Sequence, residues 1–432
     1  MKKLVSFLLC LILCVCALPF TACGGGSEEV IVGVSNATSE VNIANALVNA
    51  YKSKNPNAQI TVQRISGDYG SYVINNALSG NLPDVLFTQD DTVAYFSQEG
   101  VFEPLDSYMQ SAGIDTNIYY DAIMDISRPL DDGKTYFIPR DYNKVVCYLN
   151  VDMFSAADIE LPTDDWTWED FISICAEFRS KMDANLNQDA GIHEYAYPVY
   201  ANVGWKAVYW PIIASYGESI FNAQNGFAIT SESRAIAQLK TLVDNGYTTN
   251  PNTDGSGLFR TGQAAMSFAV RPDLSNFVTG GRNIEFVSFP AVNGVDNAKV
   301  GMGCSGYGIS SFSKNKDKAW DFLKFVMSED GQKAFGETGN GVPMIESMST
   351  DTCWKNITVS SVDLSAKNHE AFIKNANRDI VTNYMGSIPA SKHKLVYEEM
   401  DKFIKAVFSD QYKNDLSACI STYTNLLKNI IG

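Results

Sequence analysis

The sequence predicts an α/β fold divided into two lobes, on the basis of three observations. The chain has 432 residues, of which 45% are hydrophobic, a length and apolar content that favour two cores over one. Strand-like and helix-like patterns alternate from residue 30 to residue 91, an order typical of a mostly parallel sheet covered by helices. Polar residues follow each of these predicted strands, at the edge where such sheets bind ligands.

The start of the chain is predicted to be a leader that lies outside the fold. A short basic segment precedes an apolar run over 4–18, which is shorter than the roughly 20 residues of a membrane span and is typical of a secretion signal. Small residues stand before Cys23, and this resembles a bacterial lipobox in which that cysteine receives a diacylglyceryl group, although Phe20 occupies a position where Leu is usual. We expect a signal peptide at 1–22 and a flexible tether at 23–29; an uncleaved anchor or ordinary cleavage is the alternative.

Three strands and two helices are predicted in the first part of the mature chain. The β-branched run VIVGVS (30–35) and the run QITVQRI (59–65) read as strands, and a third strand lies within NLPDVLFTQDD (81–91). Apolar residues at helical spacing follow the first strand, and SYVINNALSG (71–80) reads as a helix that ends at glycine. The residues at the carboxyl ends of the strands can form hydrogen bonds: Ser35, Asn36, Asp68, Tyr69, Gln89, Asp90 and Asp91.

Further elements are predicted along the rest of the chain. The segment 131–150 contains a glycine turn and two strand-like runs. A helix is expected after Thr167, a plausible N-cap residue that two acidic residues follow closely. Apolar residues at helical spacing predict amphipathic helices over 233–247 and 316–332.

Composition narrows the class of partner. The 49 acidic and 33 basic residues give a net charge of −16, which disfavours binding of nucleic acid or of an anionic lipid surface. Only three histidines are present, none in a zinc-binding arrangement. A loop over 183–194 places Asp183, Asn185, Asn187 and Glu194 at EF-hand-like positions, but Gln188 replaces the glycine of that loop, so we expect a polar surface loop and keep calcium as the alternative. No cofactor is expected.

The order of several motifs resembles the extracellular solute-binding proteins of ABC importers, of the maltose-binding-like kind (family 1). The resemblance runs from about the tether to residue 343 and is thinner over the last ninety or so residues. The motifs are SGNLPDVLF (79–87), FEPLD (102–106), DGKTYFIPRDYNKVVCYLNVDMF (132–154), TWEDF (167–171), LFRTGQAAMSF (258–268), GYGISSFSKNKDKAWDFLKFVMSEDGQKAF (306–335) and GNGVP (339–343).

The resemblance implies two α/β lobes, each with a mostly parallel sheet, that are joined by several crossing segments and close on a ligand like a clamp. The crossings are expected near 140–146, 267–271 and 310–314. The implied boundaries place residues 30–140 and 271–312 in the N-terminal lobe and residues 141–270 and 313–432 in the C-terminal lobe. The ATPase would be a separate chain, since no phosphate-binding GxxxxGK[ST] loop is present.

The expected ligand is a sugar or oligosaccharide. A sugar offers hydroxyls at the ring edge and C–H groups on its faces, so its site needs carboxylates, amides and aromatic rings. The family positions of ligand contacts map to Asp90, Asp91, Tyr142, Asn143 and Arg271. Together with the strand ends and two residues elsewhere, the candidate ligand-binding residues are Ser35, Asn36, Asp68, Tyr69, Gln89, Asp90, Asp91, Tyr142, Asn143, Trp205, Arg271 and Ser305.

The function expected from these observations is that of a lipid-anchored, monomeric receptor that hands its sugar to the permease subunits of an importer. A secreted carbohydrate-active enzyme is one alternative, because Asp90 and Asp91 offer paired carboxylates, although adjacent residues on one loop rarely flank a scissile bond. A binding protein for a peptide or polyamine is another. A sensor partner of a histidine kinase is a third.

Overall fold

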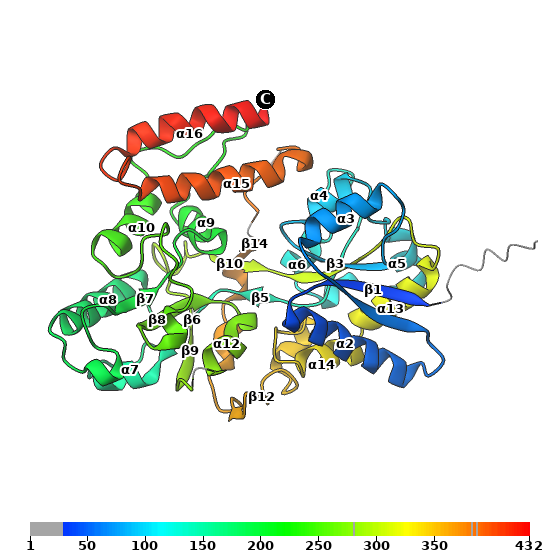
Figure 1. The fold of residues 1–432 in the computed structure, drawn as a ribbon, viewed down its shortest axis with the longest axis horizontal. Helices are drawn as coiled ribbons and strands as arrows, with labels where there is room; N and C mark the ends of the chain where they lie inside the picture. Colours follow the sequence, from blue (N-terminus) through cyan, green and yellow to red (C-terminus); the bar gives the residue numbers. More distant parts are fainter. Residues whose placement is uncertain (1–28, 280, 382, 386–387) are drawn as a thin grey trace, which may run out of the picture.

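The computed structural model describes residues 29–279, 281–381, 383–385 and 388–432. The predicted signal peptide and Cys23 lie outside these residues. The described chain forms two α/β lobes with a narrow region between them (Figure 1). The two-lobe α/β expectation is thereby confirmed. No helix in the described ranges has both the length and the apolar content that crossing a membrane requires.

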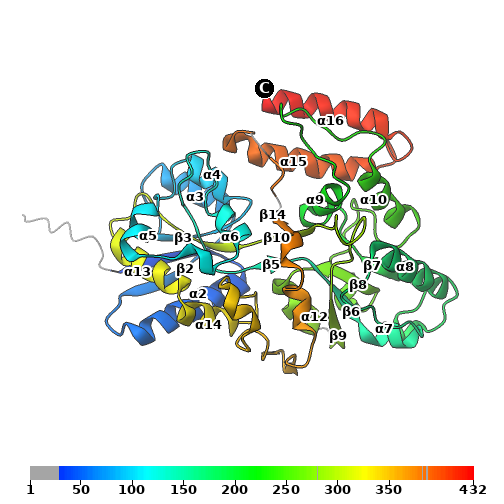
Figure 2. The same cartoon turned by 180° about the vertical axis from the view of Figure 1, so that it is seen from behind.

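The first lobe is built on a mixed five-stranded sheet. Its order is β2 (Ile60–Ile65), β1 (Val30–Ser35), β3 (Val85–Gln89), β11 (Ser305–Ile309) and β4 (Ile138–Pro139). β1 pairs in parallel with β2 and β3, whereas β11 is antiparallel to both of its neighbours. The helices of this lobe lie on both sides of the sheet (Figures 1 and 2): α2 (Thr38–Lys54), α3 (Tyr69–Ala77), α4 (Val93–Gln98), α5 (Asp106–Ala112), α6 (Asp121–Ile126), α13 (Lys316–Met327) and α14 (Glu329–Gly336).

The second lobe contains a four-stranded sheet that is mostly antiparallel. Its order is β7 (Tyr197–Tyr200), β8 (Ala264–Ala269), β6 (Val146–Asn150) and β9 (Ile284–Ser288), and only β7 and β8 run in parallel. The prediction of a mostly parallel sheet is therefore wrong for this lobe. Its helices are α7 (Val151–Ala156), α8 (Trp168–Asp183), α9 (Lys206–Ser215), α10 (Arg234–Asp244), α11 (Leu258–Thr261), α12 (Leu274–Thr279), α15 (Ala390–Val407) and α16 (Leu416–Ile431).

Local sequence signals account for several helix starts. Thr167 caps α8 in a reciprocal capping box with Asp170, as predicted. Asp68 caps α3 by accepting a hydrogen bond of 2.7 Å from the Ser71 backbone N–H. Trp168 is 1% exposed and belongs to the core of the second lobe.

A small hinge sheet lies between the lobes. It consists of β14 (Asp379–Val381), β10 (Val300–Gly303) and β5 (Asn143–Lys144). One crossing segment runs from β4 through β5 into β6, in the region expected for the first crossing. A second runs from β10 of the hinge sheet directly into β11 of the first lobe. A hairpin of β12 (Thr358–Val359) and β13 (Val362–Asp363) belongs to the segment that follows α14.

The lobe boundaries differ from those implied by the resemblance. β9 pairs along its whole length with β6, so residues 284–288 lie in the second lobe rather than the first. α13 packs on α2 and β11, so residues 316–327 lie in the first lobe rather than the second. Accordingly, the chain does not change lobe near 267–271 or 310–314. The lobe of a strand depends on its non-local pairing partner, which the order of motifs does not reveal.

Candidate functional site

The carboxyl ends of β1, β2 and β3 point towards the second lobe, and the polar residues after β3 form one side of a small cavity. This inner cavity, of about 190 Å³, is lined from the first lobe by Gln89, Asp90 and Asp91. The crossing segments contribute Asn143 and Ser305, and the second lobe contributes Trp205. These expected site residues therefore come together around one space, as the strand-end rule predicts.

Two acceptor atoms around the inner cavity have their hydrogen-bonding capacity unused. Oδ1 of Asn143 and Oδ1 of Asp91 are buried and have no hydrogen-bond partner among the described residues. Asn143 is only 9% exposed. Because a buried polar atom without a partner costs free energy, both oxygens are suited to accept hydrogen bonds from the hydroxyls of a bound ligand.

Glycines in β10 allow the cavity walls to approach each other. A Cβ on Gly303 would lie 2.5 Å from Oδ2 of Asp90, and one on Gly301 would lie 2.2 Å from the carbonyl oxygen of Ala207. Both distances are far below van der Waals contact, so any side chain here would displace the Asp90 carboxylate or the start of α9.

Trp205 lies where several cavities meet. It precedes α9 in an extended conformation, and its N–H donates to the carbonyl oxygen of Asn202 at 2.8 Å. Besides the inner cavity, Trp205 lines an outer cavity of about 610 Å³ and two further cavities of about 780 and 450 Å³. An aromatic ring at this junction offers a flat face for stacking.

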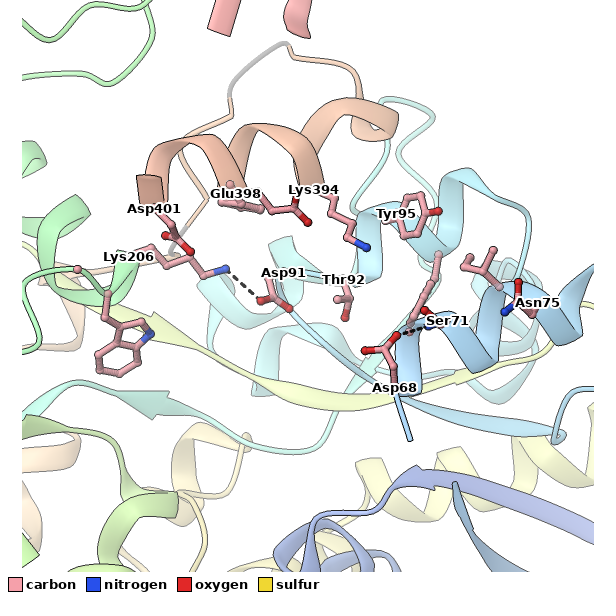
Figure 3. Close-up of a pocket in the computed structure, with 16 residues that line it drawn as sticks. Asp68, Ser71, Asn75, Asp91, Thr92, Tyr95, Lys206, Lys394, Glu398 and Asp401 are labelled. Carbon is pink, nitrogen blue, oxygen red and sulfur yellow. Dashed lines mark hydrogen bonds and ion pairs between the residues drawn. The ribbon is translucent and has the colours of Figure 1, made fainter. Parts of the chain in front are cut away.

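An ion pair joins the two lobes beside this ring. Nζ of Lys206, at the start of α9, lies 3.4 Å from Oδ2 of Asp91 and 4.3 Å from the centre of the Tyr397 ring. Figure 3 shows the pair spanning the site, with Asp401 close to Lys206. Burial raises the pKa of the Asp401 carboxyl, and the charge of Lys206 opposes that shift.

Tyr69 and Tyr142, two of the expected site residues, have structural roles instead. The Tyr69 hydroxyl donates to the carbonyl oxygen of Phe87 at 2.8 Å. Tyr142 is 1% exposed, stacks on Tyr120 with ring centres 4.3 Å apart, and hydrogen-bonds through its hydroxyl to the Asp379 carboxylate. Neither residue lines the cavities described above.

Arg271 is fully buried and faces away from these cavities. Its guanidinium donates to the carbonyl oxygens of Gly339 and Trp354, at 3.2 and 2.7 Å, and to Nδ1 of His369 at 2.8 Å. The resemblance to the family implied that Arg271 contacts the ligand. Its N–H groups instead donate to residues of the segment that follows α14.

The remaining candidates divide between the outer cavity and the surface. Asp68 lines the outer cavity as well as capping α3. Ser35 is half-buried and Asn36 is exposed, and neither lines a cavity named here.

The possible calcium loop is held together by its own hydrogen bonds. Oδ1 of Asn185 accepts from the Glu194 N–H, and Oδ1 of Asn187 accepts from the Ala190 N–H. Asp183 forms an ion pair with Arg179 at 2.7 Å. No cluster of metal-binding side chains occurs in the described ranges.

Residues on α15 and at the start of α9 line the outer cavity although the sequence motifs did not indicate them. Lys394, Tyr397, Glu398 and Asp401 line the outer cavity together with Lys206. Their spacing along α15 places them on one face of a helix, which was a usable signal, but nothing local showed that this helix covers the site.

Carboxylates, amide oxygens and aromatic rings from both lobes therefore surround one junction, an arrangement suited to holding a polar ligand between the lobes. Two proteins of similar sequence are described as binding proteins. A Bacillus subtilis galactooligosaccharide-binding protein is 23% identical over 288 residues, which cover 63% of each chain. A Brucella abortus protein described only as a binding protein is 24% identical over 310 residues, or 68% of this chain and 71% of its own.

Solved structures share the fold. An ABC substrate-binding protein from Listeria monocytogenes in complex with cycloalternan superposes with a TM-score of 0.74 at 18% identity, over 93% of this chain and 98% of the other. The family described as bacterial extracellular solute-binding protein matches residues 46–359. The resemblance seen in the sequence motifs is thus confirmed, and the chain belongs to the family of bacterial extracellular solute-binding proteins.

Proposed function

We propose that this protein captures a sugar or oligosaccharide between its lobes and delivers it to the permease of an ABC importer, whose ATPase is a separate chain. The proposal rests chiefly on one observation: Trp205 lines the inner cavity together with Asp90 and Asp91, and it also lines the outer cavity. Carboxylates accept hydrogen bonds from sugar hydroxyls, and an aromatic ring packs on the C–H face of a sugar. The Bacillus protein is described as binding galactooligosaccharide and the Listeria protein is in complex with cycloalternan, which supports the same ligand class.

The proposed function is binding of a saccharide without hydrolysis of its glycosidic bonds. A retaining glycosidase needs two carboxyl groups about 5–5.5 Å apart on opposite sides of the scissile bond. Asp90 and Asp91 are neighbours on a single loop, and Asp91 is engaged with Lys206. This arrangement favours holding a saccharide over cleaving it.

The proposed location is the outer face of the cell membrane. The family acts outside the cytoplasm, and a diacylglyceryl group on Cys23 would anchor the monomer there through the tether. Mass spectrometry of the protein from its native host tests this step. A thioether-linked diacylglyceryl on the N-terminal Cys23 is expected, whereas an unmodified terminus would contradict the anchor.

Isothermal titration calorimetry of the full chain tests the substrate class. Neutral mono- and oligosaccharides, a short peptide and a polyamine would be titrated separately, and at least one saccharide is expected to bind with micromolar or tighter affinity. Chromatography of the same mixtures should show the saccharide unchanged. Binding only of the peptide or polyamine would contradict the proposed substrate class, and release of smaller sugars would contradict the binding-only role.

Trp205→Ala is the matching variant. Loss of a stacking ring that stands at the centre of the site should weaken saccharide binding by at least about tenfold, which corresponds to about 1.4 kcal/mol. Tyr412→Ala is the control, because Tyr412 is a half-exposed aromatic residue that follows α15 in the chain. A second tryptophan such as Trp320 is unsuitable, because Trp320 belongs to the core. Equal affinities of the Trp205 variant and the wild type would contradict the assignment of the ring.

A further inference from the structure

We propose that the outer end of the first lobe, the edge at which β1, β2 and β3 begin, contacts the lipid bilayer through Leu78 and Phe312. This inference rests on the proposed lipid anchor at Cys23, because the contact needs a tether that holds the protein at the membrane. It concerns a surface opposite the ligand cavities and adds an orientation to the proposed location.

The start of β1 places the membrane near this end of the lobe. Val30 begins β1 at the edge of the sheet that lies away from the second lobe (Figures 1 and 2). Five residues separate Cys23 from Glu29, the first residue that the structure describes. A chain of this length spans at most about 20 Å, so a lipid on Cys23 would hold the outer end within that distance of the bilayer.

The loop that carries Phe312 is fastened to the start of β1. The carbonyl oxygen of Glu29 accepts a hydrogen bond of 3.2 Å from Nδ2 of Asn315. The Asp84 carboxylate accepts one of 2.6 Å from the Ser313 hydroxyl and one of 2.9 Å from a backbone N–H of β1. Phe312 therefore has a fixed place beside the point where the chain enters the fold.

Two large apolar side chains are exposed at this end. Leu78 is 88% exposed, more than any other large apolar side chain in the described ranges, and Phe312 is 44% exposed. Their segments are neighbours, since a Cβ on Gly80 would lie 3.9 Å from Cδ1 of Phe312. Apolar side chains that are exposed together indicate a contact surface, and such side chains enter the interfacial region of a bilayer.

The charges at this end favour an apolar contact over an electrostatic one. The segment that follows the loop exposes two lysines and two aspartates: Lys314, Lys318, Asp317 and Asp321. Since the whole chain carries a net charge of −16, an anionic bilayer would not attract it. The contact therefore depends on the tether, which raises the effective concentration of lipid at the apolar pair, and it should form on zwitterionic lipid.

This orientation leaves the ligand cavities open to solvent. Asp90 and Asp91 follow the carboxyl end of β3, whereas Asp84 lies at its start. β3 is five residues long, so the two ends of the strand lie about 15 Å apart. A bilayer at the outer end therefore does not cover the space into which a ligand diffuses.

A fluorescent probe beside Leu78 tests the contact. Ser79→Cys would carry an environment-sensitive dye in a Cys353→Ser background, because Ser79 is exposed and the other described cysteines are buried. The lipidated protein, with its thioether at Cys23 verified by mass spectrometry, would be reconstituted into phosphatidylcholine vesicles. The reference is the unlipidated chain 24–432, labelled in the same way and mixed with the same vesicles. Emission from the lipidated protein should shift to the blue and be at least about twofold stronger, since the interfacial region excludes water from the dye.

Matched variants assign the signal to the apolar pair. Leu78→Ser with Phe312→Ser should abolish the blue shift. Leu161→Ser with Leu186→Ser is the control, because these leucines are 40% and 60% exposed in the second lobe, and its emission should match that of the parent protein. Equal emission from the two double variants would refute the contact. Saccharide binding by calorimetry should be unchanged in both, which verifies that they fold.

Further outcomes separate this inference from the anchor and from other occupants. Absence of lipid from Cys23 in the native host would overturn both proposals, whereas unchanged emission from the lipidated protein would overturn the bilayer contact alone. A blue shift that persists in 1 M salt supports an apolar contact, and its loss would contradict one. A shift that disappears when the protein is diluted at constant lipid would assign the surface to a second copy of the chain and overturn the proposal.

Discussion

Arg271 is a fully buried arginine whose hydrogen bonds go to two carbonyl oxygens and a histidine. Because a guanidinium only donates, Nδ1 of His369 must accept, and the proton of the neutral ring is then on Nε2. That nitrogen donates to the carbonyl oxygen of Leu364 at 2.8 Å. Trp354 and Phe372 cover the guanidinium, each with its ring centre 5.0 Å from Cζ. The residue that looked like a ligand contact therefore fastens the 339–372 segment to the second lobe.

The state of His369 predicts a pH-dependent stability. Burial and the charge of Arg271 lower the pKa of His369 to about 4 from the ordinary 6.5. The unfolded chain therefore protonates His369 more readily than the folded protein does. The free energy of unfolding is thus unaffected by this group above pH 6.5 and decreases as the pH falls towards 4. The contribution is about 3 kcal/mol. Free energies of unfolding from urea titrations between pH 4 and 7 should fall less steeply for His369→Gln than for the wild type; equal slopes would contradict the prediction.

The positions of residues at the carboxyl ends of the strands could be predicted from the sequence, because these ends lie at one edge of a parallel sheet. Gln89, Asp90 and Asp91 line the inner cavity because they follow β3, and parallel strands present their carboxyl ends at one edge of the sheet. Asn143 and Ser305 were also placed near the site, since the crossing segments pass beside it. Tyr142 and Arg271 were not predictable in this way: whether a polar side chain faces a cavity or a buried partner depends on residues distant in sequence, here Asp379 and His369.

Among the secondary structure elements, the periodic helices and the first three strands were predicted well, whereas the hinge strands were not. The predicted helices after Thr167 and within 233–247 correspond to α8 and α10. The helix predicted over 316–332 is divided at Ser328 into α13 and α14. The hinge strands contain only two to four residues each, too few for a periodic pattern. The lobe boundaries depend on those strands and on β9, so they could not be read from motif order.

The β11 strand carries a glycine that the close approach of its neighbour β4 requires. A Cβ on Gly306 would lie 2.1 Å from the carbonyl oxygen of Ile138 and 2.8 Å from Cα of Pro139. Both are backbone atoms of β4, which leads into the first crossing segment, so no rotamer change can relieve the overlap.

Gly306→Ala should therefore destabilise the protein by about 1–3 kcal/mol, the usual cost of overpacking a close contact. Gly70→Ala in α3 is the control, because its nearest neighbour is 3.8 Å away and alanine favours a helix. Chemical denaturation of both variants measures the difference. If the Gly306 variant is as stable as the Gly70 variant, β4 is not held against β11 in the way described.

At the scale of the whole molecule, several features of the described residues connect the two lobes. The hinge sheet joins them through backbone hydrogen bonds, and α15 bridges them from the C-terminal side. The ion pair between Lys206 and Asp91 connects them at residues that line both the inner and the outer cavity. A ligand shifts the balance between open and closed arrangements only by the difference in its affinity for the two. We therefore expect a contact beside these cavities to bias that balance before any ligand binds.

Removing that ion pair should open the ligand-free protein. The side chains of Lys206 and Asp91 are 16% and 39% exposed, so solvent weakens the pair, and its strength is at most about 1 kcal/mol. Lys206→Met should shift the population towards the open arrangement by up to about fivefold, and small-angle scattering should record a larger radius of gyration.

Measurements at raised ionic strength and on a second variant distinguish loss of the Lys206–Asp91 ion pair from a general loss of positive charge. Raising the ionic strength should expand the wild type towards the Lys206→Met profile and leave that variant nearly unchanged, since screening weakens the same pair. Lys240→Met is the matched control: Lys240 also lies 3.4 Å from its partner, Asp244, but both belong to α10 within one lobe. Its profile should superpose on that of the wild type. If Lys206→Met also superposes on the wild type, the ion pair does not hold the lobes together, and the hinge sheet and α15 set the balance without it.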